Sequence, residues 1–153
     1  MLLARRASGS SSNLFLVDSD ALPQTKALLA NRAAAVGIEL RELAFSGGRV
    51  ASDSERIETG LPESFGVFVQ YPGASGRVWD PSPVLASVKA QDGIAVVAAD
   101  LLALTLIASP GELGADVAVG TTQRFGGPMG FGGPHAGYMA VRKGLERQLP
   151  GRL

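Results

Sequence analysis

The chain has 153 residues, 46% of them hydrophobic and 18% charged, and its 14 basic and 14 acidic residues leave no net charge. This length and composition predict a folded domain with a core, and the balanced charge argues against nucleic acid or an anionic membrane as a partner. The chain has no cysteine and one histidine, so we expect no disulfide and no metal site. Its longest apolar run, residues 101–108, is too short to span a bilayer.

Apolar runs of strand length alternate with helix-like stretches, which predicts an α/β fold with a mostly parallel sheet flanked by helices. Residues 1–7 resemble the tail of a helix. The predicted strands are residues 14–17, 38–45, 65–71, 94–99, 117–119 and 138–141. The strand 94–99 should be central and buried on both faces because no polar residue interrupts it, whereas 38–45 should be an edge or half-buried strand.

Two helices are predicted between these strands. The first should enter near Pro23 and stop at Gly37, with a cap from residues 18–20 and an apolar side made of Leu28, Leu29, Ala33 and Val36. The second should begin at residues 80–83 and end before Gly93. Residues 46–64 are expected to form a connection, with a short helical turn around 54–58.

Asp100 directly follows the predicted central strand. Open α/β sheets bind ligands outside the carboxyl ends of their strands, so Asp100 is a candidate site residue. The other interpretation is that its carboxylate caps the segment 101–108 and needs no ligand.

The most distinctive segment is GGPMGFGGPHAG, residues 126–137, preceded by QRF. Its six glycines and two prolines are incompatible with a helix or an ordinary strand, and neither GxGxxG nor GxxxxGK[ST] is present. We expect the glycines to allow close backbone approach between layers, with Met129 and Phe131 as buried anchors. His135 is expected to be a hydrogen-bonded packing element, the alternative being a general acid or base.

This segment and its surroundings, GADVAVGTTQRFGGPMGFGGPHAGYMAVRK, resemble the N-terminal half of glycine dehydrogenase (decarboxylating), the P-protein family of the glycine cleavage system. Residues 68–72, 98–100, 109–111 and 150–153 extend the resemblance over nearly the whole chain. The resemblance implies that residues 1–153 form one incomplete α/β domain, part of the large domain of the aspartate-aminotransferase-like (fold type I) pyridoxal-phosphate architecture. The family decarboxylates glycine with pyridoxal phosphate and passes the aminomethyl group to the lipoyl arm of the H-protein. We expect a cytoplasmic protein, the alternative being a mitochondrial one.

The catalytic half of this family carries a Schiff-base lysine shortly before a similar glycine-rich run. Alignment on the proline pattern puts Gln123 at that position, whereas alignment on residues 114–116 puts Arg124 there. Neither side chain can form the Schiff base. The three lysines, Lys26, Lys89 and Lys143, are expected to be solvated charges. We therefore expect no catalytic residue in this chain, with pyridoxal phosphate bound by the lysine-bearing C-terminal half.

The resemblance also implies a structural role, in which this copy packs against the lysine-bearing half and helps to wall its site. The residues expected at that interface are Gln123, Arg124, Gly126, Pro128, Met129, Gly130 and His135. Asp100 corresponds to the carboxylate that faces the pyridine ring, which makes it the candidate for cofactor binding. Arg124 could bind a carboxylate or phosphate, or instead a backbone carbonyl or a neighbouring acid. The alternative function is a non-catalytic α/β module that binds a partner or small ligand.

Overall fold

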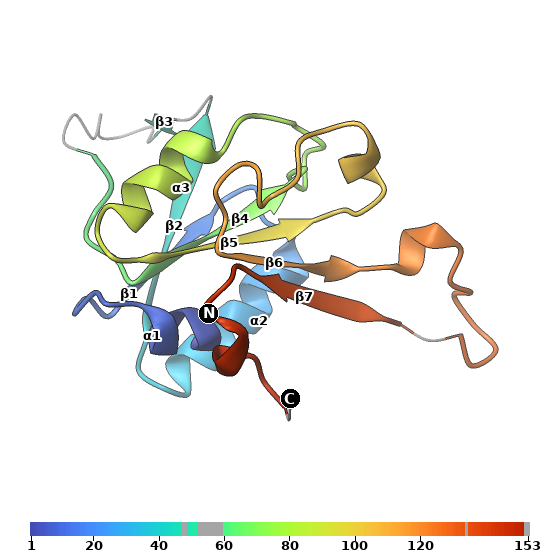
Figure 1. The fold of residues 1–153 in the computed structure, drawn as a ribbon, viewed down its shortest axis with the longest axis horizontal. Coiled ribbons are helices and arrows are strands. Elements are labelled where there is room, and N and C mark those ends of the chain that lie inside the picture. The colour runs from blue at the N-terminus through green and yellow to red at the C-terminus, as the bar shows by residue number, and fades with distance from the viewer. Residues whose placement is uncertain (47–48, 52–59, 134, 152–153) are drawn as a thin grey trace.

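The computed structural model describes residues 1–46, 49–51, 60–133 and 135–151, and its centre is a seven-stranded sheet in the order β3-β2-β1-β4-β5-β6-β7 (Figure 1). The strands are β1 (Leu14–Asp18), β2 (Glu39–Ser46), β3 (Arg49–Ala51), β4 (Gly66–Tyr71), β5 (Ile94–Ala99), β6 (Val117–Thr121) and β7 (Gly137–Val141). The five inner strands run parallel, and β3 and β7 pair antiparallel at the two edges. The mostly parallel sheet and the central position of β5 are confirmed.

Helices cover both faces of the sheet, which gives three layers. The helices are α1 (Leu2–Ala7), α2 (Pro23–Ala34) and α3 (Ser82–Lys89), with short 3-10 turns η1 (Ala103–Thr105), η2 (Gln123–Phe125) and η3 (Glu146–Gln148). In Figure 1, α1 and α2 lie on one face and α3 lies on the other. Side chains of β1 alternate between the layers: Phe15 and Val17 join the core with α1 and α2, and Leu14 and Leu16 join the core with α3.

Helix α2 differs from the prediction at its start and on its surface. The residue before it is Leu22, whose apolar side chain cannot cap the helix. Of the predicted capping acids, Asp18 is buried at the end of β1 and accepts from the Asp20 amide at 3.0 Å, and Asp20 accepts from Ser75. On the predicted apolar side, Leu28 is 57% exposed. Val36, 55% exposed, lies in the turn after the helix, which ends at Ala34 and not near Gly37. The helix contacts the sheet along a narrower stripe than a helical-period pattern suggests.

The connection between β2 and β4 holds one element that was not predicted. Strand β3 has three residues and pairs antiparallel with the end of β2. So short a strand carries too few residues for a periodic pattern to be visible. The predicted helical turn around residues 54–58 lies outside the described residues.

The amino edge of the sheet is fastened by a buried acid, Asp116, which directly precedes β6. Its Oδ2 accepts from the Ala95 amide at 2.9 Å. Its Oδ1 lies 2.6 Å from Arg142 Nε and 3.5 Å from Lys89 Nζ. This one carboxylate therefore ties together the start of β5, the end of β7 and the end of α3.

Candidate functional site

The candidate site lies at the opposite, carboxyl edge, where the ends of three strands meet. Asp100 follows β5, and its amide donates to the carbonyl of Tyr71 at the end of β4 (3.2 Å). The hydroxyl of Tyr138, at the start of β7, donates to the Ala99 carbonyl at 3.2 Å. The turn η2 follows β6 and brings Gln123 and Arg124 to the same edge. Parallel strand order thus gathers residues that are far apart in the sequence.

Both oxygens of Asp100 are engaged within the chain. Oδ1 accepts from the Leu102 amide at 3.0 Å, as expected for a cap, and Oδ2 forms an ion pair with Arg124 Nη1 at 2.8 Å. The Asp100 side chain is 24% exposed and the Arg124 side chain 65% exposed. The neighbouring acid that Arg124 binds is therefore Asp100 itself, and the negative charge at the end of β5 already has a counter-ion.

Tyr138 packs tightly beside this ion pair. Burial, together with the charge of Asp100, raises the pKa of the Tyr138 hydroxyl above its usual value. The ring lies against Gly120 of β6: a Cβ added there would lie 2.4 Å from the Ala99 carbonyl oxygen and 2.6 Å from the Tyr138 ring. Glycine at position 120 is therefore required for β5, β6 and β7 to meet as they do.

Gln123 shapes the glycine-rich segment that leaves η2. Its Nε2 donates to the carbonyls of Gly127 (2.9 Å) and Pro128 (3.0 Å). A Cβ on Gly133 would lie 2.2 Å from the Pro128 carbonyl oxygen. The predicted close backbone approach exists, but within the loop itself and not between layers. We call residues 126–133 the arm.

The arm projects away from the body of the sheet, as the orange segment between β6 and β7 shows (Figure 1). Met129 is 96% exposed and Phe131 is fully exposed, so the prediction that they are buried anchors is wrong for this chain. His135 is also exposed, so it is not buried within this chain, and its role at an interface stays a prediction. Gly126, Pro128 and Gly130 are exposed on the same segment. Nothing else among the described residues reaches out far enough to cover them.

A second acid lies at the carboxyl edge, Asp18, which the sequence analysis treated as a possible helix cap and not as a site residue. It ends β1 beside β4, where the chain changes winding direction, and it is fully buried. Burial is the main cause that raises the pKa of the Asp18 carboxyl, and its Oδ2 has no hydrogen-bond partner among the described residues. The signal available in the sequence was an acid directly after an unbroken apolar strand.

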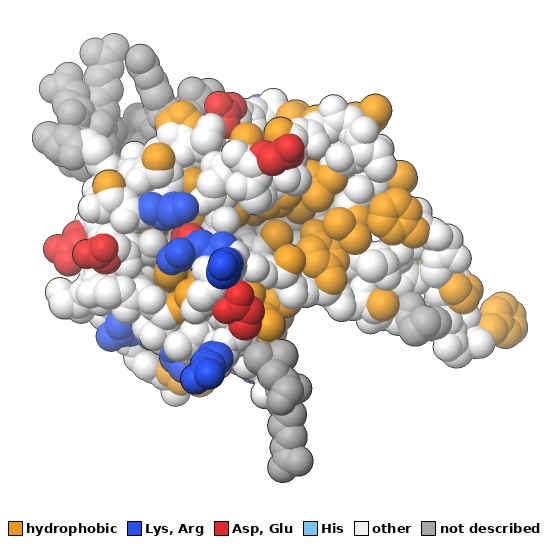
Figure 2. All heavy atoms as spheres, viewed as in Figure 1, with side chains coloured by type: hydrophobic (Ala, Val, Ile, Leu, Met, Phe, Trp, Pro, Cys, Tyr) orange, Lys and Arg blue, Asp and Glu red, His pale blue; other side chains and the backbone are white. Residues whose placement is uncertain are grey.

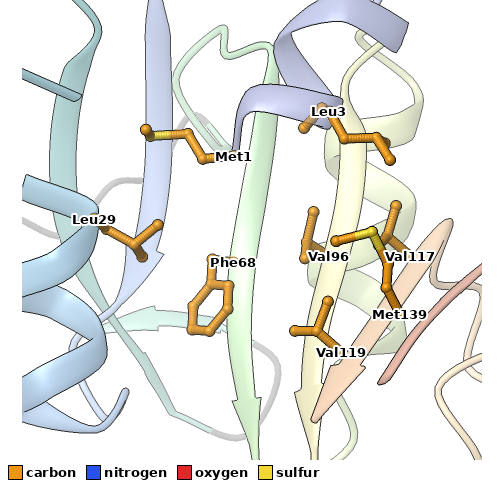
Figure 3. A pocket seen from close by; sticks show the side chains of 9 residues that line it. Met1, Leu3, Leu29, Phe68, Val96, Val117, Val119 and Met139 are labelled. Carbon is orange, nitrogen blue, oxygen red and sulfur yellow. The ribbon is translucent and has the colours of Figure 1, made fainter. Parts of the chain in front are cut away.

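An apolar pocket of about 190 Å³ lies on the sheet face between α1 and α2 (Figure 3). Leu3 and Leu29 border it from the two helices, and Phe68, Val96 and Met139 form its floor on the strands. The side chains that line it are all apolar, so they offer packing and no acid or base. The sequence pattern gave no sign of this pocket.

The residues at the carboxyl edge do not fit pyridoxal phosphate. The Gln123 amide already donates to the arm, and Arg124 is paired with the Asp100 carboxylate. A pyridinium nitrogen would need that carboxylate as its own partner. The lysines lie elsewhere. Lys89 and Lys143 are exposed, as predicted, and Lys26 is half-buried. Lys26 pairs with Glu42 at 2.9 Å, and Lys89 lies 3.5 Å from Asp116. Within the described residues, no cluster of acids and histidines could hold a metal ion, and no helix is long and apolar enough to span a membrane.

The doubly wound sheet, with an acid after β5 and with glutamine and arginine after β6, is an α/β domain, and its structural neighbours place it in the pyridoxal-phosphate fold type I class. The fold is shared with cystathionine gamma synthase from Xanthomonas oryzae pv. oryzae, with a TM-score of 0.71 and 21% identity over 96% of this chain and 36% of that one. The predicted fold class is confirmed.

The family follows from the sequence comparisons. The model of the glycine cleavage system P-protein matches residues 1–153, and the chain belongs to that family. Glycine dehydrogenases (decarboxylating) of Rhodopseudomonas palustris (strain BisA53) and Nitrobacter hamburgensis are 51% and 53% identical over all 153 residues. The chain spans 15% of the length of each of these relatives.

A solved structure agrees with this assignment. The crystal structure of glycine decarboxylase (P-protein) of the glycine cleavage system, in inhibitor-bound form, matches with a TM-score of 0.80 and 39% identity. That match covers 99% of this chain and 33% of the other. The resemblance drawn from the glycine-rich segment is thus confirmed at the level of the family.

Proposed function

We propose that this chain is the lysine-lacking segment of a glycine dehydrogenase (decarboxylating) and serves there as a structural, site-supporting part. In this proposal the longer polypeptide decarboxylates glycine with pyridoxal phosphate held by its lysine-bearing half. It passes the aminomethyl group to the lipoyl arm of the H-protein, in the cytoplasm of a bacterium. Support comes from the family match and from identities above half to relatives of that name.

One observation carries the supporting role: the ion pair between Asp100 and Arg124, with Gln123 beside it. A guanidinium stays protonated at every working pH, so it neutralises the carboxylate permanently. An amide has no nucleophilic nitrogen, and Gln123 already donates to two carbonyls of the arm. In a lysine-bearing copy the carboxyl edge would hold the cofactor. In this chain, the Asp100–Arg124 pair and Gln123 already bind one another or the arm there.

In this proposal the residues of this chain have structural roles and take no part in the chemical steps. Gln123 holds the arm, and Asp100 and Arg124 keep the carboxyl edge electrically neutral beneath it. Tyr138 and Gly120 fix the spacing of the last three strands. Together they form the edge that faces the rest of the longer polypeptide, and on this edge the charge of Asp100 is balanced by Arg124. We include Gly126, Pro128, Met129, Gly130 and His135 in that surface.

The test uses the polypeptide in its source cells. The natural protein that yields the peptide 125–142 is isolated, its mass is measured, and it is reduced with borohydride before lysine mapping. We expect a chain several times longer than 153 residues, with the pyridoxyl label on a lysine outside residues 1–153.

Two results would contradict the proposal in different ways. A natural mass near 15.7 kDa would leave the alternative, a non-catalytic α/β module that binds a partner or small ligand. A label on Lys26, Lys89 or Lys143 would instead show that this chain is itself a pyridoxal-phosphate enzyme.

A further inference from the structure

The arm belongs to an uncharged stretch of the chain. From Phe125 to Val141 there is no aspartate, glutamate, lysine or arginine in seventeen residues. Within this stretch Phe125 is 58% exposed, Met129 is 96% exposed and Phe131 is fully exposed. Figure 2 shows hydrophobic side chains along this projecting part of the molecule. Single exposed apolar residues are ordinary, but several together on a projecting loop mark an interaction surface.

The arm is held in a defined shape. The side chain of Gln123 bonds to two of its carbonyls, and Gly133 packs against the backbone of Pro128. Phe131 adopts a φ of 54°, a left-handed conformation that costs a non-glycine residue energy. A strained loop that holds a phenylalanine in solvent indicates a binding role. Because the loop already has its bound shape, less conformational entropy is lost when a partner binds.

We propose that Met129 and Phe131 form a knob that inserts into an apolar cleft of the lysine-bearing half of the longer polypeptide. This rests on the proposed function and names the contact that it leaves open. The relatives are several times longer than this chain, which makes up 15% of their length, so other parts of the same polypeptide are present at high effective concentration. A surface without charges requires a cleft that is apolar and whose own polar groups are already paired.

The place of the arm on the fold favours this occupant. The arm starts from η2, at the carboxyl edge that carries Asp100 and Arg124. A partner that receives the knob therefore also faces this edge. The lysine-bearing half would do so if this chain forms one wall of its cofactor site. A second copy of this chain is the competing occupant, because the apolar pocket between α1 and α2 could accept one aromatic ring. The experiment separates the two.

The first measurement is photo-crosslinking in the natural full-length polypeptide. Benzoyl-phenylalanine replaces Phe131, and the cross-linked peptides are mapped by mass spectrometry. We expect a cross-link to a peptide of the lysine-bearing half. Val36, 55% exposed after the end of α2 at the opposite edge, is the matched control and should give none. Cross-links to Phe68 or Val96 of a second molecule, or no protein cross-link at all, would overturn the proposal.

The second measurement separates binding from folding. Phe131→Asn keeps a residue that tolerates the left-handed conformation and removes the aromatic ring. In the 153-residue chain we expect an unchanged melting temperature, because the ring contacts nothing there. In the full-length polypeptide we expect glycine decarboxylation to fall roughly tenfold or more, as for an interface hot spot, whereas Val36→Asn leaves it unchanged.

The two proposals fail separately. A natural polypeptide of 153 residues would end the proposed function and this inference together. A long polypeptide with its label on a downstream lysine, in which Phe131→Asn is as active as the parent, would refute the knob and leave the proposed function standing.

Discussion

Replacing Asp116 by alanine should cost this chain a large part of its stability. The carboxylate is 1% exposed and holds the start of β5 through the Ala95 amide at 2.9 Å. It also pairs with Arg142 at 2.6 Å and Lys89 at 3.5 Å. Alanine would leave a buried amide without an acceptor and two cations without their counter-ion, although Lys89 would keep its hydrogen bond to the Gly114 carbonyl.

The magnitude follows from how exposed each partner is. A buried amide left without an acceptor costs about 1–3 kcal/mol. The side chains of Arg142 and Lys89 are 53% and 39% exposed, so water can solvate them again and each lost ion pair counts for at most about 1 kcal/mol. We expect a loss of about 3 kcal/mol for Asp116→Ala. For a chain of this size that is a fall in melting temperature of roughly 6–12 °C. Asp116→Asn keeps an acceptor oxygen and should lose only about 1 kcal/mol.

Urea unfolding followed by the fluorescence of Trp79, the chain's single tryptophan and a buried one, measures these differences. The control is Glu39→Ala, which removes a surface pair with Arg41 whose side chains are 60% and 49% exposed. It should change the free energy of unfolding by less than about 0.5 kcal/mol. An Asp116→Ala variant within about 1 kcal/mol of the parent would refute the reasoning. A loss for asparagine equal to that for alanine would show that charge matters more than the hydrogen bond.

Three further predictions concern the carboxyl edge. Gly120→Ala should destabilise the chain by about 2–3 kcal/mol, because its Cβ would lie 2.4 Å from a carbonyl oxygen of β5, whereas Gly111→Ala, whose Cβ meets nothing within 4 Å, should be neutral in the same urea assay. Burial raises the pKa of both Tyr71 and Tyr138, so in the folded state their hydroxyls stay protonated up to a higher pH than in the unfolded state. Stability should therefore fall as pH rises above about 10, and Tyr138→Phe should lessen that fall in alkaline melting curves. Gln123→Ala should free the arm, which would show as faster amide exchange and faster proteolysis at residues 126–133. Unchanged exchange would contradict the role of the two Gln123 hydrogen bonds in holding the arm.

Much of the fold could be predicted because its strands are buried on both faces. Residues 94–99 contain no polar side chain, and they form β5, the strand between β4 and β6. Parallel order then places the residues after each strand at one edge, which is how Asp100 and the turn after β6 come together. Strand β3 escaped prediction because three residues at a sheet edge carry no usable period.

Side-chain environments were harder to predict than elements. Helical spacing put Leu28 and Val36 on the buried side of a helix that ran to Gly37. Leu28 is exposed because the sheet covers only part of α2, and Val36 is exposed because it lies after the end of the helix. Asp18 resembled a helix cap by position alone, yet it is buried at the end of β1. The local sequence shows which side chains are able to cap a helix, but tertiary packing determines which of them bind the helix end.

The largest error concerns Met129 and Phe131, and it has a physical meaning. An apolar stretch with no charge indicates burial in whatever assembly the polypeptide forms, not burial in the piece at hand. Within this chain the two side chains are exposed, on a loop whose shape is fixed by Gln123. If the arm only linked β6 to β7, neither the two Gln123 hydrogen bonds nor the strained φ of Phe131 would be needed, since a flexible polar loop joins two antiparallel strands with less strain. A defined and apolar arm is explained by a surface that receives it.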